Sequence, residues 1–164
     1  MEGWDPDWMD AEAELCRLIY YSRVRERVSR ADLKDILGRS RRNNAGAGVT
    51  GALCFDNSHF LQVLEGRRLH VNRVFRRILA DSRHYDVSTV IFAPIAERLF
   101  PVWSMLYVGD DRLTQDVCRR FCGVTSFHPD RLTADRATAL VAHFAGLAKV
   151  GAEPAEDGTA APNA

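Results

Sequence analysis

Two short apolar runs joined by a tight turn constrain the fold of this chain more than any other feature. Residues 49–55 (VTGALCF) and 59–65 (HFLQVLE) have the composition of strands, and the turn Asp56-Asn57-Ser58 between them favours a β-hairpin. Gln62 stands among the apolar residues of the second run. A buried amide without a hydrogen-bond partner costs roughly 1–3 kcal/mol. Gln62 therefore needs a partner, and the identity of that partner is the functional question.

Three glycines near the hairpin have the spacing of a dinucleotide-binding fingerprint. Gly46, Gly48 and Gly51 form G-x-G-x-x-G, which binds pyrophosphate when it follows a strand and opens a helix. Here the order is reversed, because a helical pattern precedes the glycines and a strand follows them. We interpret Gly46 and Gly48 as the stop and loop after a helix, with Gly51 inside the strand.

The remaining patterns complete a β-α-β-β-α-β-β order. A helix is expected after the N-cap Ser29, with Asp32 as its capping-box partner, and it runs to about Asn43. The other expected elements are strands at 15–23, 49–55, 59–65, 87–93 and 100–108, and a second helix at 67–81. This order predicts an α+β, ferredoxin-like sheet with two helices on one face.

The composition fits one domain with short appendages. The chain has 164 residues, of which 46% are hydrophobic, and its formal net charge of zero disfavours a general nucleic-acid binder. We expect an acidic N-terminal lead (1–14, with Trp4 and Trp8), a main domain (15–110), a C-terminal helical extension (111–150) and a disordered tail (151–164). The two short helices of the extension would cover the bare face of the sheet or make an oligomer contact.

Cysteine spacing and hydropathy indicate a cytoplasmic protein. The four cysteines form no C-x-x-C pair and no zinc-finger spacing, so we expect free thiols and no metal site. The N-terminus is acidic and lacks the apolar run of a secretory signal. No apolar run approaches the ~20 residues of a membrane span, so no membrane partner is expected.

Strand alternation brings several polar side chains into one apolar slot. Tyr20 and Gln62 are expected on the same face of two central strands, under the helix layer, and Asn43 and Asn44 end the first helix near them. A phenol and two or three amides suit the edge of a planar polar ring better than they suit hydrolysis. Spacing alone leaves open a core role for Tyr20 and a helix C-cap role for Asn44.

Five ordered segments of the chain resemble a known family. They are LIYYS around Tyr20, RRNNAGAGVTGAL, FLQVLEG, VFRRILADSRHYDV and FPVWSM. Over residues 15–110 their order and spacing resemble the BLUF domain, a blue-light sensor that uses flavin. The resemblance implies that FAD sits between the two helices with its ring reaching the sheet. It also implies a sensor rather than an enzyme. We expect this sensor to signal to a downstream effector protein in trans and to form a homo-oligomer.

The resemblance assigns roles to the polar residues of the slot. Tyr20 matches the photoactive tyrosine of the family and Gln62 matches its switching glutamine. Asn44 matches the asparagine that bonds the carbonyl edge of the ring, and Asn43 lies beside it in sequence. Tyr20 would donate an electron under blue light while a proton moves through Gln62. The Gln62 amide would be left rotated or tautomerised, with a small red shift that recovers in the dark.

Five further residues match family positions. Ile36 and Ile78 match the apolar side chains on the two sides of the ring, and Arg77 matches a helix arginine near the flavin. Trp103 and Met105, in the expected strand at 100–108, match the pair that relays the change outward.

Three other functions remain open on the residues alone. One is an acylphosphatase-like hydrolase on the same scaffold, which would be colourless. Another is a flavin oxidoreductase, although no general acid or base is placed for one. The third is an RNA-binding sheet, against which the neutral charge and the missing RNP pattern argue.

Overall fold

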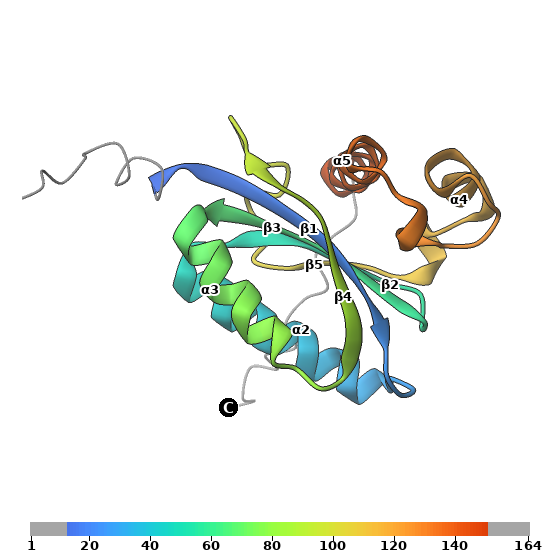
Figure 1. The fold of residues 1–164 in the computed structure, drawn as a ribbon, viewed down its shortest axis with the longest axis horizontal. Helices are drawn as coiled ribbons and strands as arrows, with labels where there is room; N and C mark the ends of the chain where they lie inside the picture. Colours follow the sequence, from blue (N-terminus) through green and yellow to red (C-terminus); the bar gives the residue numbers. More distant parts are fainter. Residues whose placement is uncertain (1–12, 151–164) are drawn as a thin grey trace, which may run out of the picture.

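The computed structural model describes residues 13–150, a mixed sheet with helices on both of its faces (Figure 1). Most of the expected acidic lead and the whole tail at 151–164 lie outside the described residues. The elements are β1 (Leu15–Val24), α2 (Arg30–Ala47), β2 (Thr50–Phe55), β3 (His59–Arg67), α3 (Arg68–Leu79), β4 (His84–Pro94), β5 (Leu106–Val108), α4 (Gln115–Cys122) and α5 (Ala134–Val150). Two 3-10 turns, 110–112 and 129–131, flank α4.

The strand order is β4-β1-β3-β2-β5, which confirms the ferredoxin-like prediction. β1 lies between β4 and β3 and is antiparallel to both, and β5 runs parallel to β2 at the opposite edge. The register places Tyr20 of β1 directly opposite Gln62 of β3. Side chains alternate between the two faces of each strand, so these two residues point to the same side of the sheet.

Each face of the sheet has its own hydrophobic core. Helices α2 and α3 cover one face, while α4 and α5 cover the other (Figure 1). The core under α2 and α3 contains Leu18, Leu64 and Val71. The core under α4 and α5 contains Ile19 and Leu140. The C-terminal helices therefore cover the otherwise bare face of the sheet, one of the two roles expected for them.

Helix α2 begins as predicted and ends later than predicted. The Ser29 hydroxyl accepts from the Asp32 N–H at 3.1 Å and the Asp32 carboxylate accepts from the Ser29 N–H at 2.9 Å, which completes a capping box. The helix continues past Asn43 to Ala47, so the helix does not stop at Gly46 as interpreted from the sequence. Gly48 is the C-cap because its φ of 65° is the left-handed conformation that glycine adopts at little cost.

The expected strand at 100–108 is mostly irregular, and only Leu106–Val108 forms β5. Pro101 has no N–H to donate to a ladder. The N–H groups of Leu99 and Phe100 donate to the Glu65 carboxylate instead of to a neighbouring strand. Trp103 and Met105 therefore lie in the connection before the strand rather than inside it.

Residues 13–150 contain neither a membrane-spanning helix nor a cluster of metal-binding side chains. None of their helices combines the length and the apolar character needed to cross a membrane. They hold no group of histidine, cysteine and acidic side chains that could bind a metal ion.

Candidate functional site

A cavity of about 260 Å³ lies between α2, α3 and the sheet. Its polar end is formed by the sheet residues Tyr20 and Gln62 and by Asn43 and Asn44 of α2. The remaining lining residues are Ile36, Arg39, Ser40, Leu53, Phe60, Val74, Arg77, Ile78, Asp81, Arg83 and His84. The cavity thus joins an amide-rich end and apolar walls to three arginines.

Tyr20 and Gln62 form the central hydrogen bond of the site. The Tyr20 hydroxyl donates to Gln62 Oε1, and both side chains are buried. Burial raises the pKa of Tyr20 above its ordinary value, so the phenol keeps its proton and remains the donor. The Tyr20 ring also packs against Phe75 of α3, with 5.1 Å between the ring centroids. Gln62 has thereby found the partner that its position in an apolar strand required.

The other end of the Gln62 amide contacts Met105. Gln62 Nε2 donates to Met105 Sδ at 3.6 Å, and Met105 is buried in the core under α2 and α3. Its thioether is a weak acceptor. One amide therefore connects Tyr20 on one side with the connection between β4 and β5 on the other.

Asn44 holds the same connection from the α2 side. Its Nδ2 donates to the Ser104 carbonyl at 2.7 Å, and Arg41 Nε donates to the Met105 carbonyl at 3.2 Å. Asn44 is buried, with 1% of its surface exposed, although it lies in the last turn of a surface helix. Its side chain is therefore part of the packed site.

The sequence-predicted residues divide into two groups. The cavity gathers seven of them: Tyr20, Ile36, Asn43, Asn44, Gln62, Arg77 and Ile78. Met105 does not line the cavity but touches it through Gln62. Trp103 lies on the other side, because its ring packs against the core under α4 and α5. The two residues expected to act as a pair therefore face different cores.

Sequence reasoning missed several lining residues that helical spacing marks. On α2, Arg39 and Ser40 follow Ile36 at the spacings of one helix face, which also carries Asn43 and Asn44. After Val74, Arg77 and Ile78, the same period reaches Asp81 just past the end of α3. Helical spacing counted from one wall residue on each helix would have identified these lining residues.

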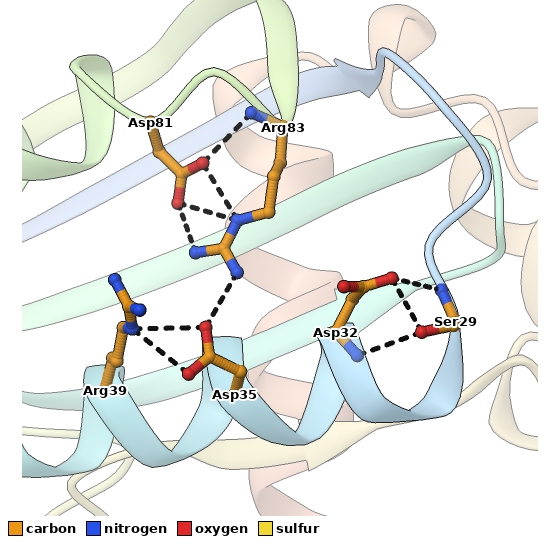
Figure 2. Close-up of polar contacts among 6 residues, drawn as sticks. All are labelled: Ser29, Asp32, Asp35, Arg39, Asp81 and Arg83. Carbon is orange, nitrogen blue, oxygen red and sulfur yellow. Dashed lines mark hydrogen bonds and ion pairs between the residues drawn. The ribbon is translucent and has the colours of Figure 1, made fainter.

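A charged network connects α2 to the segment that follows α3, beside the cavity (Figure 2). Arg83 Nε donates to the Asp81 carboxylate at 2.9 Å, and Arg83 Nη1 donates to Asp35 of α2 at 3.0 Å. Arg39 Nε also reaches Asp35 at 3.1 Å. The network holds α2 against the segment that follows α3 and keeps two cationic groups at the cavity.

The carboxyl of Asp81 gives the network a defined pH dependence. Hydrogen bonds from Arg83 lower the pKa of Asp81, so this stabilisation is complete above about pH 4, the ordinary carboxyl pKa, and is lost as the pH falls below it. We expect Asp81→Asn to lack that contribution at every pH. The difference in the free energy of unfolding between the native chain and Asp81→Asn should narrow from about pH 6 to about pH 3.

Urea unfolding across this pH range would measure that difference. Asp116→Asn is the matched control, because Asp116 pairs with Arg119 at an exposed position of α4 and should contribute little. A difference for Asp81→Asn that stayed constant with pH would show that this carboxyl does not titrate as the contacts indicate.

His84 closes the cavity where β4 begins. Its Nε2 lies 2.8 Å from the Ile78 carbonyl and its Nδ1 lies 2.8 Å from the Ser22 hydroxyl. A carbonyl only accepts, so Nε2 carries a proton and donates to it. The imidazole therefore joins the end of α3 to strand β1.

The family model for sensors of blue light using FAD, named BLUF, matches residues 15–106. This match covers more than half of the chain, and the chain belongs to the BLUF family. It is a blue-light sensor domain, and the family resemblance of its sequence segments is confirmed.

The curated relatives are much longer than the match. Photoactivated adenylate cyclase subunit beta of Euglena gracilis is 37% identical over 103 residues, which are 62% of this chain and 12% of the relative. The blue light- and temperature-regulated antirepressor BluF of Escherichia coli is 35% identical over 82 residues, 49% of this chain and 20% of the relative. This chain therefore corresponds to a small part of each of these proteins.

Solved structures of short BLUF proteins match at nearly full length. The dark-state structure of BlrB has a TM-score of 0.68 at 33% identity, covering 83% of this chain and 98% of BlrB. The photo-activated state of BlsA has a TM-score of 0.75 at 29% identity, covering 87% of this chain and 99% of BlsA. The likeness extends beyond residues 15–106, because these 92 of the 164 residues are about 56% of the chain whereas the two structures cover 83% and 87% of it.

Proposed function

We propose that the cavity between α2 and α3 binds the ring of FAD and that Tyr20 and Gln62 convert light absorption into a rearranged hydrogen-bond network. The single observation that carries this proposal is the chain of contacts from Tyr20 through Gln62 to Met105. These contacts lie at the polar end of the cavity and end at the connection between β4 and β5. In this proposal residues 15–110 are the flavin-binding unit and 111–150 are its helical extension.

The residues around the cavity fit the parts of FAD. Ile36 on α2 and Ile78 on α3 offer apolar walls for the two faces of a flat ring, while Asn44 and Gln62 offer amides to its polar edge. The cavity of about 260 Å³ is slightly smaller than the range of roughly 300–1,000 Å³ for small-molecule sites, so it suits the ring system rather than the whole dinucleotide.

Arginines beside the cavity favour FAD as the flavin. Arg39, Arg77 and Arg83 line it, and guanidinium groups bind phosphate oxygens through paired hydrogen bonds. FAD would present a pyrophosphate to these arginines, whereas FMN would present a single phosphate. FAD retention should therefore exceed FMN retention when both are offered to the apoprotein.

The protein's part in the photochemistry is a change at Gln62. A bound flavin supplies the absorption of blue light and the oxidising power of its excited state. Tyr20 would give up an electron and its hydroxyl proton to the flavin, with the proton passing through the Gln62 amide. Tyr20 would regain both on recombination, so no net oxidation remains and only the Gln62 amide is changed. If the Gln62 side chain turns over, its Nε2 leaves Met105 Sδ and its Oε1 takes that place. The contact with Met105 then loses its donor, because an amide oxygen and a thioether sulfur both accept.

The output of this change would be a population shift in the β4–β5 connection. Asn44 bonds the Ser104 carbonyl and Gln62 bonds Met105, so both ends of the polar cluster touch this connection. A difference of one or two hydrogen bonds supplies only a few kcal/mol, enough to bias two nearby conformations. We propose that a partner protein reads this bias and that the chain itself is not an enzyme. We also propose that the chain forms a homo-oligomer.

An absorption spectrum before and after a blue-light pulse tests the proposal. Flavin bands should move a little to the red and return in the dark. Bands that bleach or stay fixed would contradict a light-driven hydrogen-bond change, and a protein that binds no flavin would contradict the cofactor.

A further inference from the structure

Glu65 is a buried carboxylate on the same strand as Gln62 but on the opposite face of the sheet. Its side chain is 0% exposed. It accepts three hydrogen bonds: from Arg17 Nε at 2.7 Å, from the Leu99 N–H at 3.0 Å and from the Phe100 N–H at 3.0 Å. The proposed photochemistry makes no use of these contacts, so their purpose needs its own explanation.

The cost of burying this charge shows that the contacts have to be well formed. An ionised carboxylate removed from water is expensive unless it is paired and its remaining lone pairs are satisfied. Arg17 lies directly opposite Glu65 in the β1–β3 register and supplies the countercharge. The two backbone N–H groups belong to the connection between β4 and β5. That connection is therefore fixed to β3 at Leu99 and Phe100.

Arg98 fixes the same point from the other side. Its Nη1 donates to the Thr50 hydroxyl at 2.8 Å and to the Glu65 carbonyl at 3.1 Å, and its Nη2 donates to the Gly48 carbonyl at 2.9 Å. Side chains and backbone thus hold residues 98–100 to two separate segments, residues 48–50 and Glu65 of β3.

The remainder of the connection is held by the residues of the cavity. Met105 accepts from Gln62, Ser104 accepts from Asn44, and one backbone bond of 3.0 Å joins the Gly51 N–H to the Trp103 carbonyl. Val102 lies between the two anchored parts and is 76% exposed. The connection therefore has a part fixed by Glu65, a part that touches the light-sensitive amide, and an exposed apolar residue between them.

We propose that Glu65 is a positioning residue that makes Phe100 a fixed pivot, so that a change at Gln62 moves residues 101–105 and leaves residues 98–100 in place. This inference rests on the proposed function. Gln62 and Glu65 are three residues apart on one strand and act on opposite ends of one connection. A rigid β3 therefore turns a small rotation of one amide into displacement of a short segment that carries Val102 and Trp103.

The first test uses the native chain, with residue-specific amide hydrogen exchange and amide chemical shifts recorded in the dark and under blue light. Light should change the Trp103, Ser104 and Met105 amides and leave those of Leu99 and Phe100 unchanged. Equal light-induced changes at both sets of amides would overturn the pivot. This test needs no substitution, so it decides the question even if a Glu65 variant does not fold.

The second test compares Glu65→Gln with Glu97→Gln. Glu97 is an exposed acid in the same connection, and within residues 13–150 its side chain makes no hydrogen bond or ion pair, so it is the matched control. Glu65→Gln should raise amide exchange at Leu99 and Phe100 about tenfold in the dark, because a neutral amide is a weaker acceptor than a carboxylate. Its flavin red shift should stay normal, while the light-induced change spreads to residues 98–100.

The outcomes separate this inference from the proposed function. A native chain without a red shift would contradict the photosensor, yet the dark exchange at Leu99 and Phe100 would still test whether Glu65 holds them. A normal red shift with Glu65→Gln indistinguishable from Glu97→Gln would overturn the role of Glu65 and leave the photosensor intact.

Discussion

Replacing Tyr20 by phenylalanine is expected to leave flavin bound and to abolish the blue-light red shift. The substitution removes the hydroxyl that donates to Gln62 Oε1 and leaves the ring that packs against Phe75. Without the phenol there is no proton for Gln62 to pass, so the amide has no reason to turn. The unpaired Gln62 oxygen should lower the free energy of unfolding by roughly 1–3 kcal/mol, which a folded domain tolerates.

The absorption spectrum of Tyr20→Phe before and after a light pulse measures this effect, and Tyr21→Phe is its control. Tyr21 is the next residue on β1, half-buried against the core under α4 and α5 and therefore on the other face of the sheet. It should keep a full red shift. A normal photocycle in Tyr20→Phe, or its loss in both variants, would refute the role assigned to the Tyr20 hydroxyl.

The part of the site that lies in regular strands was predictable from the sequence. Strand side chains alternate strictly, so Tyr20 and Gln62 could be placed on one face before their register was known. The helix positions were predicted only in part, because the family resemblance supplied Ile36, Arg77 and Ile78 and the other lining residues on the same helix faces were missed. The ferredoxin-like order then brought the two strands and the two helices together.

The connection between β4 and β5 was not predictable, since its conformation depends on distant side chains. The alternation of Trp103, Met105 and Tyr107 is typical of a strand, but the backbone before Leu106 is held by Glu65 and Asn44 instead of a ladder. These contacts join residues far apart in sequence, and no local pattern encodes them. The opposite placement of Trp103 and Met105 follows from that irregular backbone.

Gly51→Ala is expected to cost about 3 kcal/mol or more in the free energy of unfolding, as overpacking against rigid backbone does. A Cβ built at Gly51 of β2 would lie 1.9 Å from the Val63 carbonyl oxygen of β3. That oxygen belongs to a central strand and cannot rotate away, so the two strands would have to separate. The Gly51 N–H also bonds the Trp103 carbonyl, so the displaced strand would disturb the connection that carries Met105.

Gly46→Ala is the matched control, because both changes add one methyl group to a glycine of the same G-x-G-x-x-G motif. A Cβ at Gly46 meets nothing within 4 Å, and the residue lies inside α2, where alanine is favoured over glycine by roughly 0.5–1 kcal/mol. The free energy of unfolding measured in urea should therefore fall for Gly51→Ala and rise for Gly46→Ala. A loss below about 0.5 kcal/mol in Gly51→Ala would mean that β2 and β3 are not packed as tightly as their contacts indicate. A pyrophosphate-binding fingerprint needs its glycines so that the ligand can approach the backbone closely. A stabilised Gly46→Ala variant that still bound flavin would therefore show that these glycines serve the chain's own packing.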